Sequence, residues 1–262
     1  MRELLVGLGG YLNGKLIVIG EWGIFVYWIV RACFKRPFDL KQIREQVDEI
    51  GYKSLPIVVL SALSIGMVMV LQLAFSFKRF GARGLVGPVV ALSIVRELGP
   101  IITSLLVGGR VGSGITAEIG SMQVTEQIDA IRTLGADPIK KLVVPRFIAA
   151  LISFPFLAII ADFVGIFGGM IMAEMELGVT PRQFLEGVRV EVTFTDFFSG
   201  VLKTVFFGLL VTTVASFVGM RAAGGTQGVG RATTLTVVIS LVLSIISNFF
   251  LTKLLLMLWP VV

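Results

Sequence analysis

Five long apolar segments constrain the fold of this chain more than any other feature. At about 1.5 Å of rise per residue, a helix of about 20 apolar residues matches the hydrocarbon thickness of a bilayer. The segments are residues 55–77, 85–109, 147–173, 197–218 and 235–259. Because a segment in lipid must satisfy its backbone polar groups internally, segments of this composition cross as helices. The sequence therefore predicts an all-α polytopic membrane protein.

Composition excludes several kinds of chemistry. The chain is 55% hydrophobic and only 15% charged, which is typical of the membrane class. It contains no histidine, which removes imidazole catalysis and histidine metal sites, and the single Cys33 forms neither an internal disulfide nor a CxxC site. No GxxxxGK[ST] phosphate loop is present. We expect no enzyme activity, no metal and no cofactor on this chain.

The formal net charge of +6 has two interpretations, an acidic partner such as nucleic acid or the basic cytoplasmic loops of a membrane protein. Lys and Arg are concentrated before the first apolar segment and between the second and third. This distribution favours the second interpretation, with the N-terminus and residues 110–146 in the cytoplasm and the C-terminus outside. No nucleic-acid partner is expected. In the acidic loop 174–196, Thr180-Pro181 predicts the start of a short helix.

Residues 1–53 differ from the rest of the chain. In residues 1–34, Trp22 and Trp28 stand among aliphatic residues with basic residues at both margins. This pattern favours a helix lying in the membrane interface, and a short span is the alternative. Residues 35–53 are polar with a heptad-like apolar pattern and predict a surface helix. We expect interfacial and elbow helices at 1–53 and a transmembrane domain at 54–262.

Small and polar residues recur at every fourth position on the last two segments. The recurring residues are Gly200, Thr204, Gly208, Thr212 and Ser216, followed by Thr236, Ser240, Ser244, Asn248 and Thr252. Helices associate in lipid through small residues that permit close approach and through polar groups that need partners. Such faces indicate helix packing. Because a bundle of about five helices has few interior faces, the remaining faces favour a homodimer.

Two adjacent charges, Arg96 and Glu97, interrupt the second segment. The apolar pieces on either side are each about a dozen residues, too short to cross alone, so the charges lie near mid-membrane. Adjacent helical residues point about 100° apart and cannot satisfy each other, so each needs a partner on another helix. We expect Glu97 to pair with Lys203, and Arg96 to pair with Asp162 or with a second copy. Pro100 should bend the helix there.

These buried charges have three interpretations. They form a structural ion pair that fixes helix register, or they form the polar floor of a cavity that handles a charged headgroup. In the third interpretation, the protein is an ion-coupled secondary transporter or a stator-like ion channel in which Glu97 or Asp162 titrates.

The polar segment 124–135 follows a cluster of glycines and has the signals of an amphipathic helix. Thr125 is a plausible N-cap, Glu126 and Asp129 suit the positive end of the helix dipole, and Gly135 can close the helix in the left-handed conformation. The apolar face comprises Val124, Ile128, Ile131 and Leu134. Such a helix either lies on the membrane or docks into a soluble partner, and the charged face favours docking.

A series of motifs in this region resembles one family. The motifs are RELGP at 96–100, GRVGS at 109–113, AEIGSM at 117–122, TEQIDA at 125–130, LGADP at 134–138 and LVVPR at 142–146. Together they resemble the signature of the MlaE (YrbE) family, the permease subunits of MCE-associated ABC transporters. The resemblance extends over essentially the whole chain beyond about residue 40, and motifs in a fixed order are more specific than any single one.

The resemblance implies a homodimeric permease in the bacterial inner membrane that moves phospholipid between the inner and outer membranes. It implies a cytoplasmic ABC ATPase that binds ATP, a small STAS-domain protein and a periplasmic MCE-domain protein as partners. It also implies that the segment 124–135 is the coupling helix on which the ATPase acts. The residues assigned to that contact are Thr125, Glu126, Ile128, Asp129, Ile131, Arg132 and Gly135.

The resemblance further implies that lipid lies between the first, second and fifth spans of the two subunits. By that resemblance the pocket residues are Met67, Val70, Leu71, Ala74, Glu97, Leu98 and Ile101. The charges within the spans add Arg96 and Lys203 to the expected cavity, and the polar face of the last span adds Asn248.

Overall fold

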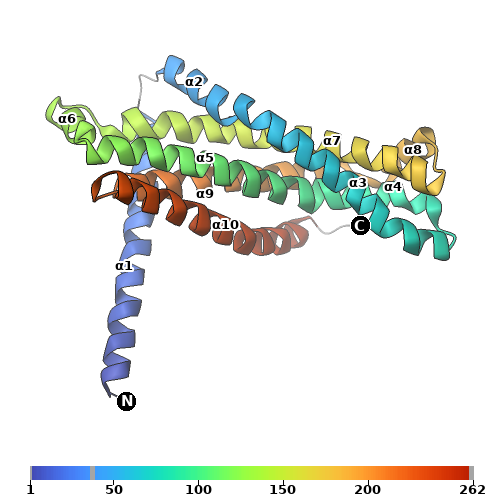
Figure 1. Cartoon of the computed structure of the whole chain (residues 1–262), viewed down its shortest axis with the longest axis horizontal. Helices are drawn as coiled ribbons and strands as arrows, with labels where there is room; N and C mark the ends of the chain where they lie inside the picture. Colours follow the sequence, from blue (N-terminus) through green and yellow to red (C-terminus); the bar gives the residue numbers. More distant parts are fainter. Residues whose placement is uncertain (1, 36–38, 260–262) are drawn as a thin grey trace.

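The computed structural model describes residues 2–35 and 39–259, and the elements in this part of the chain are helical, which confirms the all-α prediction (Figure 1). The α-helices are α1 (Arg2–Cys33), α2 (Leu40–Ile50), α3 (Leu55–Arg79), α4 (Val86–Ser93), α5 (Gly99–Val124), α6 (Gln127–Thr133), α7 (Val144–Leu177), α8 (Pro181–Glu191), α9 (Phe194–Gly219) and α10 (Gly225–Leu258).

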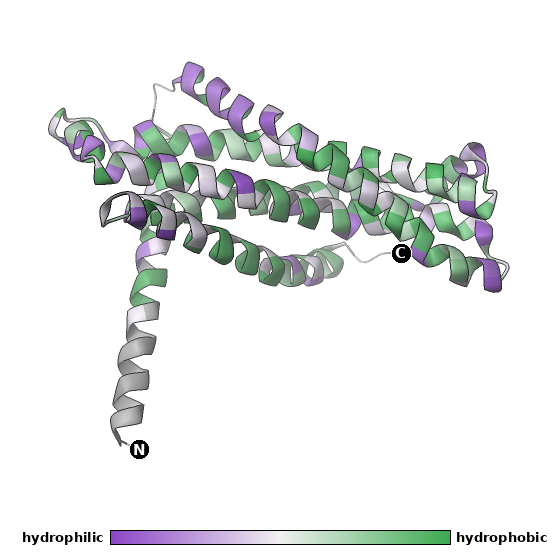
Figure 2. Ribbon diagram, viewed as in Figure 1, coloured by the Kyte–Doolittle hydropathy of each residue, from purple (hydrophilic) through white to green (hydrophobic). Residues whose placement is uncertain are grey.

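The long helices α3, α5, α7, α9 and α10 run along one another and form a bundle (Figure 1). Five stretches that are long and apolar enough to cross a membrane correspond to the five predicted segments, and a sixth lies in residues 16–33. Hydrophobic residues cover much of the bundle (Figure 2), and large ones such as Phe163 and Phe249 are exposed. An exposed apolar surface of this extent fits a protein whose surroundings are lipid.

Helix α1 differs from the others in direction. It extends away from the bundle near the end that carries α6, across the direction of the long helices (Figure 1). Its C-terminal half contacts the segment Ile139–Val143 and α9. If the long helices cross the membrane, α1 runs along the membrane surface, which favours the interfacial interpretation of residues 1–34. The division at residue 53 stays a prediction.

Close helix contacts occur where the sequence places small residues. On α3, a Cβ added at Gly66 would lie 1.8 Å from the carbonyl oxygen of Gly165 on α7. Hydroxyl pairs join α5 to α10. Ser104 donates to Ser244 at 2.9 Å, and Thr116 donates to Thr236 at 2.8 Å. Thr236, Ser240 and Ser244 are buried, which confirms the packing interpretation of the polar face on the last span.

The second predicted span ends much later than expected. Instead of stopping at Gly109, helix α5 continues without a break to Val124. Two of the glycines beyond residue 108, Gly112 and Gly120, have other parts of the chain packed against them. A Cβ at Gly112 would lie 3.4 Å from Val211, and one at Gly120 would lie 3.2 Å from Ala222. Close tertiary packing thus offsets the poor helix propensity of glycine.

Two π-helical turns interrupt the bundle, and each precedes a proline. They cover Ile94–Leu98, between α4 and α5, and Ile139–Val143, just before α7. Pro100 and Pro145 follow within the first two positions of the next helix. Proline lacks the N–H that an α-helical turn would use, and the wider turn accommodates this loss. The expected irregularity beside Arg96 and Glu97 is therefore present as a π-turn.

Two shorter predicted helices are also confirmed. Helix α2 covers part of the predicted surface helix at 35–53, with Asp39 as its N-cap. Helix α8 begins as predicted, because Thr180 accepts from the Gln183 backbone and the Gln183 side chain accepts from Thr180 N. Phe184 of α8 is buried against α4, where Gly87 permits the approach.

Candidate functional site

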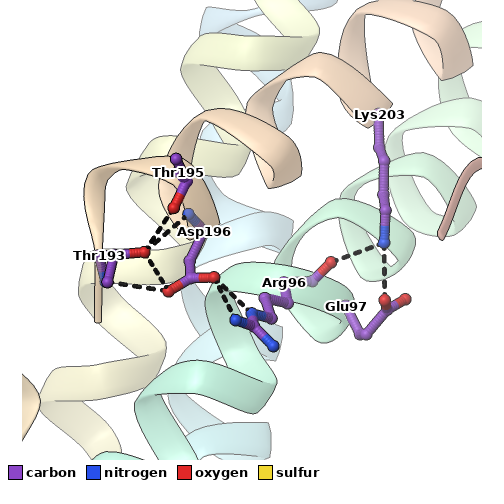
Figure 3. Close-up of polar contacts among 6 residues, drawn as sticks. All are labelled: Arg96, Glu97, Thr193, Thr195, Asp196 and Lys203. Carbon is purple, nitrogen blue, oxygen red and sulfur yellow. Dashed lines mark hydrogen bonds and ion pairs between the residues drawn. The ribbon is translucent and has the colours of Figure 1, made fainter. Parts of the chain in front are cut away.

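A partly buried ion pair joins the π-turn to α9, as the sequence predicts. Lys203 Nζ lies 2.7 Å from Glu97 Oε1, and the Lys203 side chain is only 1% exposed while that of Glu97 is 37% exposed (Figure 3). Burying a lysine to this extent is costly unless it is paired and hydrogen-bonded. The Lys203 ammonium therefore needs further hydrogen-bond partners, and the structure supplies them.

The Lys203 ammonium also donates to the backbone carbonyl of Arg96 at 2.9 Å. In a regular α-helix that carbonyl would accept from the N–H of residue 100, but residue 100 is a proline and has none. Pro100 thus leaves an acceptor that Lys203 occupies. Pro100 therefore contributes to the cluster, because it leaves the Arg96 carbonyl available to Lys203 on α9.

Helix α10 contributes two polar side chains to the same cluster. Asn248 Nδ2 donates to Glu97 Oε2 at 3.0 Å, and Thr252 Oγ1 lies 3.0 Å from Glu97 Oε1 and 2.7 Å from Lys203 Nζ. Thr252 can accept from the lysine and donate to the carboxylate. The cluster therefore connects the π-turn, α9 and α10. Asn248 belongs to this cluster through Glu97, and its expected place in a lipid cavity stays a prediction.

The expected pairing of Arg96 with Asp162 was wrong. Arg96 pairs with Asp196 in the first turn of α9, with Nη2 to Oδ1 at 2.5 Å and Nε to Oδ1 at 2.6 Å (Figure 3). Asp196 is held by Thr193, whose N–H and hydroxyl donate to Oδ2 at 2.9 and 2.7 Å. Asp162 instead lies on α7 beside Gly99, and its buried Oδ1 has no hydrogen-bond partner among the described residues.

These charges line a cavity of about 360 Å³ at one end of α9 and α10. Arg96, Glu97, Asp196 and Lys203 form its charged part, and Leu255, Leu256 and Trp259 form an apolar part. A cavity that places paired charges beside an apolar wall suits a ligand with a charged group and a hydrocarbon portion.

The pocket residues expected on α3 do not share this cavity. Val70 and Ala74 are buried among residues of α4, α7 and α8, whereas Leu71 is exposed and Met67 is half-buried. Leu98 and Ile101 are half-buried and pack on the hydrophobic core. The described residues that line this cavity include none from α3. Within one chain, the α3 residues and the Glu97 cluster are therefore separate.

The segment 124–135 forms the short helix α6, with a different start from the one predicted. Thr125 ends α5, where its hydroxyl donates to Ser121 O at 2.8 Å, and Glu126 precedes α6 in the left-handed conformation with φ of 61°. Gly135 closes α6 with φ of +75°, as predicted. Thr125 is wrong as an N-cap because its hydroxyl is already bonded within the preceding turn.

The two faces of α6 have different environments. Ile128 is buried and Ile131 is half-buried against the chain's own core, so neither is free for a partner in this conformation. Asp129 and Arg132 are exposed and form a local ion pair at 3.0 Å, and Leu134 is 84% exposed. The surface open to a partner is therefore the charged face together with Leu134.

The sequence-based prediction missed Asp196 and Thr193 as members of the site. The signal was the T-x-x-D spacing at the start of a helix, which is a capping-box pattern, and the structure has that box. Another contact joins two of the motifs. Arg146 Nη2 of LVVPR lies 2.6 Å from Glu118 Oε1 of AEIGSM. The motifs thus meet in space as contacts between α5 and α7.

The fold and the site define a polytopic membrane permease, with paired charges inside a helical bundle and an exposed charged helix at one end. Residues 43–254 match the family model described as Permease MlaE. The chain belongs to the MlaE permease family, and by this membership it is a non-catalytic permease subunit of an ABC transporter.

Named relatives show the same family. A probable ABC transporter permease protein of Rickettsia typhi is 40% identical over 90% of this chain and 92% of its own length. The intermembrane phospholipid transport system permease protein MlaE of Haemophilus influenzae is 40% identical over 74% of this chain and 75% of its own length. The chloroplastic protein TRIGALACTOSYLDIACYLGLYCEROL 1 of Arabidopsis thaliana is 35% identical over 86% of this chain and 64% of its own length.

Proposed function

We propose that this permease moves phospholipids between the inner and outer membranes, with ATP hydrolysed by a separate partner ATPase. The name of the Haemophilus influenzae relative supports the substrate class. The observation that carries the proposal is the cavity in which the Glu97–Lys203 pair and the Arg96–Asp196 pair lie beside Leu255 and Trp259. Phospholipids combine charged headgroups with hydrocarbon chains, and this lining offers partners for both.

Arg96 is the residue we assign to the lipid phosphate. Its side chain is 25% exposed, whereas the Lys203 side chain is 1% exposed and its ammonium makes three polar contacts. A guanidinium can bind phosphate oxygens with two parallel hydrogen bonds. Lys203 and Glu97 would then hold the π-turn in place, and Arg96 would exchange part of its contact with Asp196 for the headgroup.

A homodimer would bring the separated pocket residues together. Leu71 on α3 is exposed, and α10 exposes Val242, Ile246 and Phe249. If the outer face of α10 from one copy packed near α3 of the other, the expected lipid contacts on α3 would border the Glu97 cluster of the second copy. The remaining expected contacts, Met67, Leu98 and Ile101, are half-buried and would lie near that border.

The exposed face of α6 is the proposed contact for the ATPase. Glu126, Asp129, Arg132 and Leu134 are exposed on this turn. Helix α5 runs from the π-turn to this region as one helix of 26 residues, a length of about 39 Å at 1.5 Å per residue. A displacement of α6 would therefore reach the charge cluster through one continuous, closely packed helix.

The remaining parts of the proposal concern topology and partners. The distribution of Lys and Arg supports an inner-membrane protein with its N-terminus and α6 in the cytoplasm and its C-terminus in the periplasm. The cavity opens near the start of α9 and the end of α10, which this topology puts on the periplasmic side. A periplasmic MCE-domain protein would exchange lipid with the permease there, and a STAS-domain protein would bind with the ATPase.

Native mass spectrometry of the protein purified with its ATPase tests the proposal. We expect two copies of the chain, the ATPase and bound phospholipid in one complex. Asp129→Ala combined with Leu134→Ala should release the ATPase and leave the dimer intact, whereas Arg182→Ala on the exposed surface of α8 should change neither. A lipid-free monomer would contradict the proposal.

The ion-coupled alternative makes the opposite prediction. A carrier or channel that uses Glu97 would transport without an ATPase and would lose that activity in Glu97→Gln. Proteoliposomes that contain the chain alone measure this directly. We expect no ion flux in them, and flux that depends on Glu97 would replace the phospholipid proposal.

A further inference from the structure

A second cavity, of about 680 Å³, lies between α1, α9 and α10 and is separate from the Glu97 site. The two cavities have no lining residue in common. The apolar lining of the second cavity includes Ile19 and Trp22 from α1, Val214 from α9, and Leu235, Ile239 and Leu243 from α10. Its volume falls within the range of about 300–1,000 Å³ typical of ligand pockets.

The cavity is positively charged at one end. Arg221 and Arg231 line it, and the described residues of the lining include no Asp or Glu. Arg221 is paired with Glu21 at 2.7 Å and lies over the Phe217 ring at 4.1 Å. Arg231 has no ion pair with any residue that the structure describes. The cavity therefore has a positive charge that the surrounding protein does not neutralise.

Uncharged donors also line the cavity. Trp22 lines the cavity, and its buried Nε1 has no hydrogen-bond partner among residues 2–35 and 39–259. Helix α10 begins after Gly224, which lines the cavity in the left-handed conformation, and no side chain caps its first turn. A buried indole N–H without an acceptor is costly, and an anionic ligand would supply that acceptor.

The order of residues along α10 indicates what kind of anion fits. Arg231, Leu235, Ile239 and Leu243 recur at every fourth position and all line the cavity. The lining thus runs from one charged position to three apolar ones over 12 residues, about 18 Å at 1.5 Å per residue. Half of a hydrocarbon core of about 30 Å is of similar length. A lipid in one leaflet has the same arrangement, with its charged headgroup at the membrane surface and its acyl chain in the hydrocarbon core.

We propose that this cavity binds one anionic phospholipid of the surrounding bilayer, with its phosphate at Arg231 and an acyl chain along Leu235, Ile239 and Leu243. The inference does not depend on which substrate the permease transports. A neighbouring cavity of about 470 Å³ includes Phe217 and Arg221 together with Arg132 of α6. The bound lipid would therefore lie beside the proposed ATPase contact and hold α1 against the bundle.

Photolabelling of the complete complex in nanodiscs tests this site. The probes are phosphatidylglycerol and phosphatidylcholine, each with a diazirine in one acyl chain, and the labelled peptides are mapped by mass spectrometry. We expect phosphatidylglycerol to label residues 235–243. Arg231→Gln should reduce this label about fivefold, since one basic residue near the surface contributes about 1 kcal/mol to binding an anionic lipid. Arg189→Gln, on exposed α8, should leave the label unchanged.

Further variants separate this site from the transport site. Ile239→Trp should fill the cavity and reduce labelling while the complex still elutes intact. Glu97→Gln should leave labelling at 235–243 unchanged even if transport is lost. Equal labelling by both lipids would overturn the proposal. Labelling that is unchanged in both Arg231→Gln and Ile239→Trp would also overturn it. Cross-links from Leu235→Cys to a second copy would also overturn it, because protein would then fill the cavity.

Discussion

The Glu97 cluster and helix α6 both contain acidic and basic residues close together in sequence, yet they use them differently. In the cluster, Arg96 and Glu97 each pair with α9, about 100 residues away, and Lys203 is 1% exposed. In α6, Asp129 pairs with Arg132 only three residues away, and both side chains are more than half exposed. The charges of the cluster pair across the bundle, whereas the charges on α6 pair within one helical turn.

The difference follows from the surroundings. A charge in lipid or in a protein interior has no water to stabilise it, so it needs an opposite charge nearby. That pairing fixes the position of its helix relative to the helix that carries the opposite charge. A charge in water is already solvated, and an exposed pair contributes little. The cluster therefore fixes the relative position of helices, and the exposed charges on α6 remain available to another protein.

Removing the buried lysine should have the largest effect. Lys203→Met leaves the Glu97 carboxylate without its cation and the Arg96 carbonyl without a donor, so we expect the free energy of unfolding to fall by about 3 kcal/mol. Unfolding in mixed detergent micelles measures it. Lys53→Met, which breaks an exposed pair with Glu49, is the matched control and should cost less than about 1 kcal/mol.

A double-mutant cycle sharpens that result. If Glu97 and Lys203 act as a pair, Glu97→Gln together with Lys203→Met should be no more destabilised than Lys203→Met alone. If the losses in free energy of unfolding from the two single variants simply added in the double variant, Glu97 and Lys203 would contribute independently. The difference between the cluster and α6 would then not be explained by pairing.

Close helix approach beside the cluster should have the next largest effect. A Cβ at Gly200 of α9 would lie 2.2 Å from the Val95 carbonyl oxygen in the π-turn, so Gly200→Ala must push the two elements apart. We expect a loss of about 2 kcal/mol in the same unfolding assay. Gly109→Ala is the control, because nothing lies within 4 Å of its added Cβ. Equal losses at both positions would contradict the steric explanation.

On α6 we expect a small stability effect and a large binding effect. Asp129→Ala removes an exposed i,i+3 pair and should change the free energy of unfolding by about 0.5 kcal/mol or less. Copurification of the ATPase should nevertheless fall. If Asp129→Ala lowers stability as much as Lys203→Met does, the two regions do not differ in the way described.

The smallest expected effect is a pH dependence at Glu49, in the polar helix α2 that precedes the first span. A hydrogen bond from Lys53, and the charges of Lys53 and Arg110, hold the pKa of Glu49 below its usual 4.5. A lowered pKa stabilises the fold above the unfolded-state pKa, and this contribution disappears as the pH falls through the folded-state pKa. Melting temperatures of the native protein and Glu49→Gln should therefore differ slightly at neutral pH and converge in acid.

Much of this arrangement could be predicted from the sequence. The spans and the end of α6 at Gly135 follow from local rules, since hydropathy and a left-handed glycine each act over a few residues. The Glu97–Lys203 pair follows from the need of a charge inside a span for an opposite charge on another span. The partner of Arg96 could not be predicted in this way. Choosing Asp196 over Asp162 depends on the direction in which the π-turn points Arg96, and that direction is set by three-dimensional packing.

The end of α5 was missed for a related reason. The apolar run of the second segment stops at Gly109, but the helix continues, with Val211 packed against Gly112 and Ala222 packed against Gly120. The start of α6 was missed because Thr125 has two possible uses, and its bond to Ser121 ends one helix instead of starting the next.

The π-turn at Ile94–Leu98 also determines which neighbours each half of the second span contacts. A π-turn holds one residue more than an α-turn, and one residue corresponds to about 100° of rotation. Helix α4 packs on α8 and α7, whereas α5 packs on α9 and α10. Deleting a single residue from 94–98 would restore a regular helix and rotate α4 by about a quarter turn relative to α5. This short insertion thus sets the alignment between the two ends of the permease.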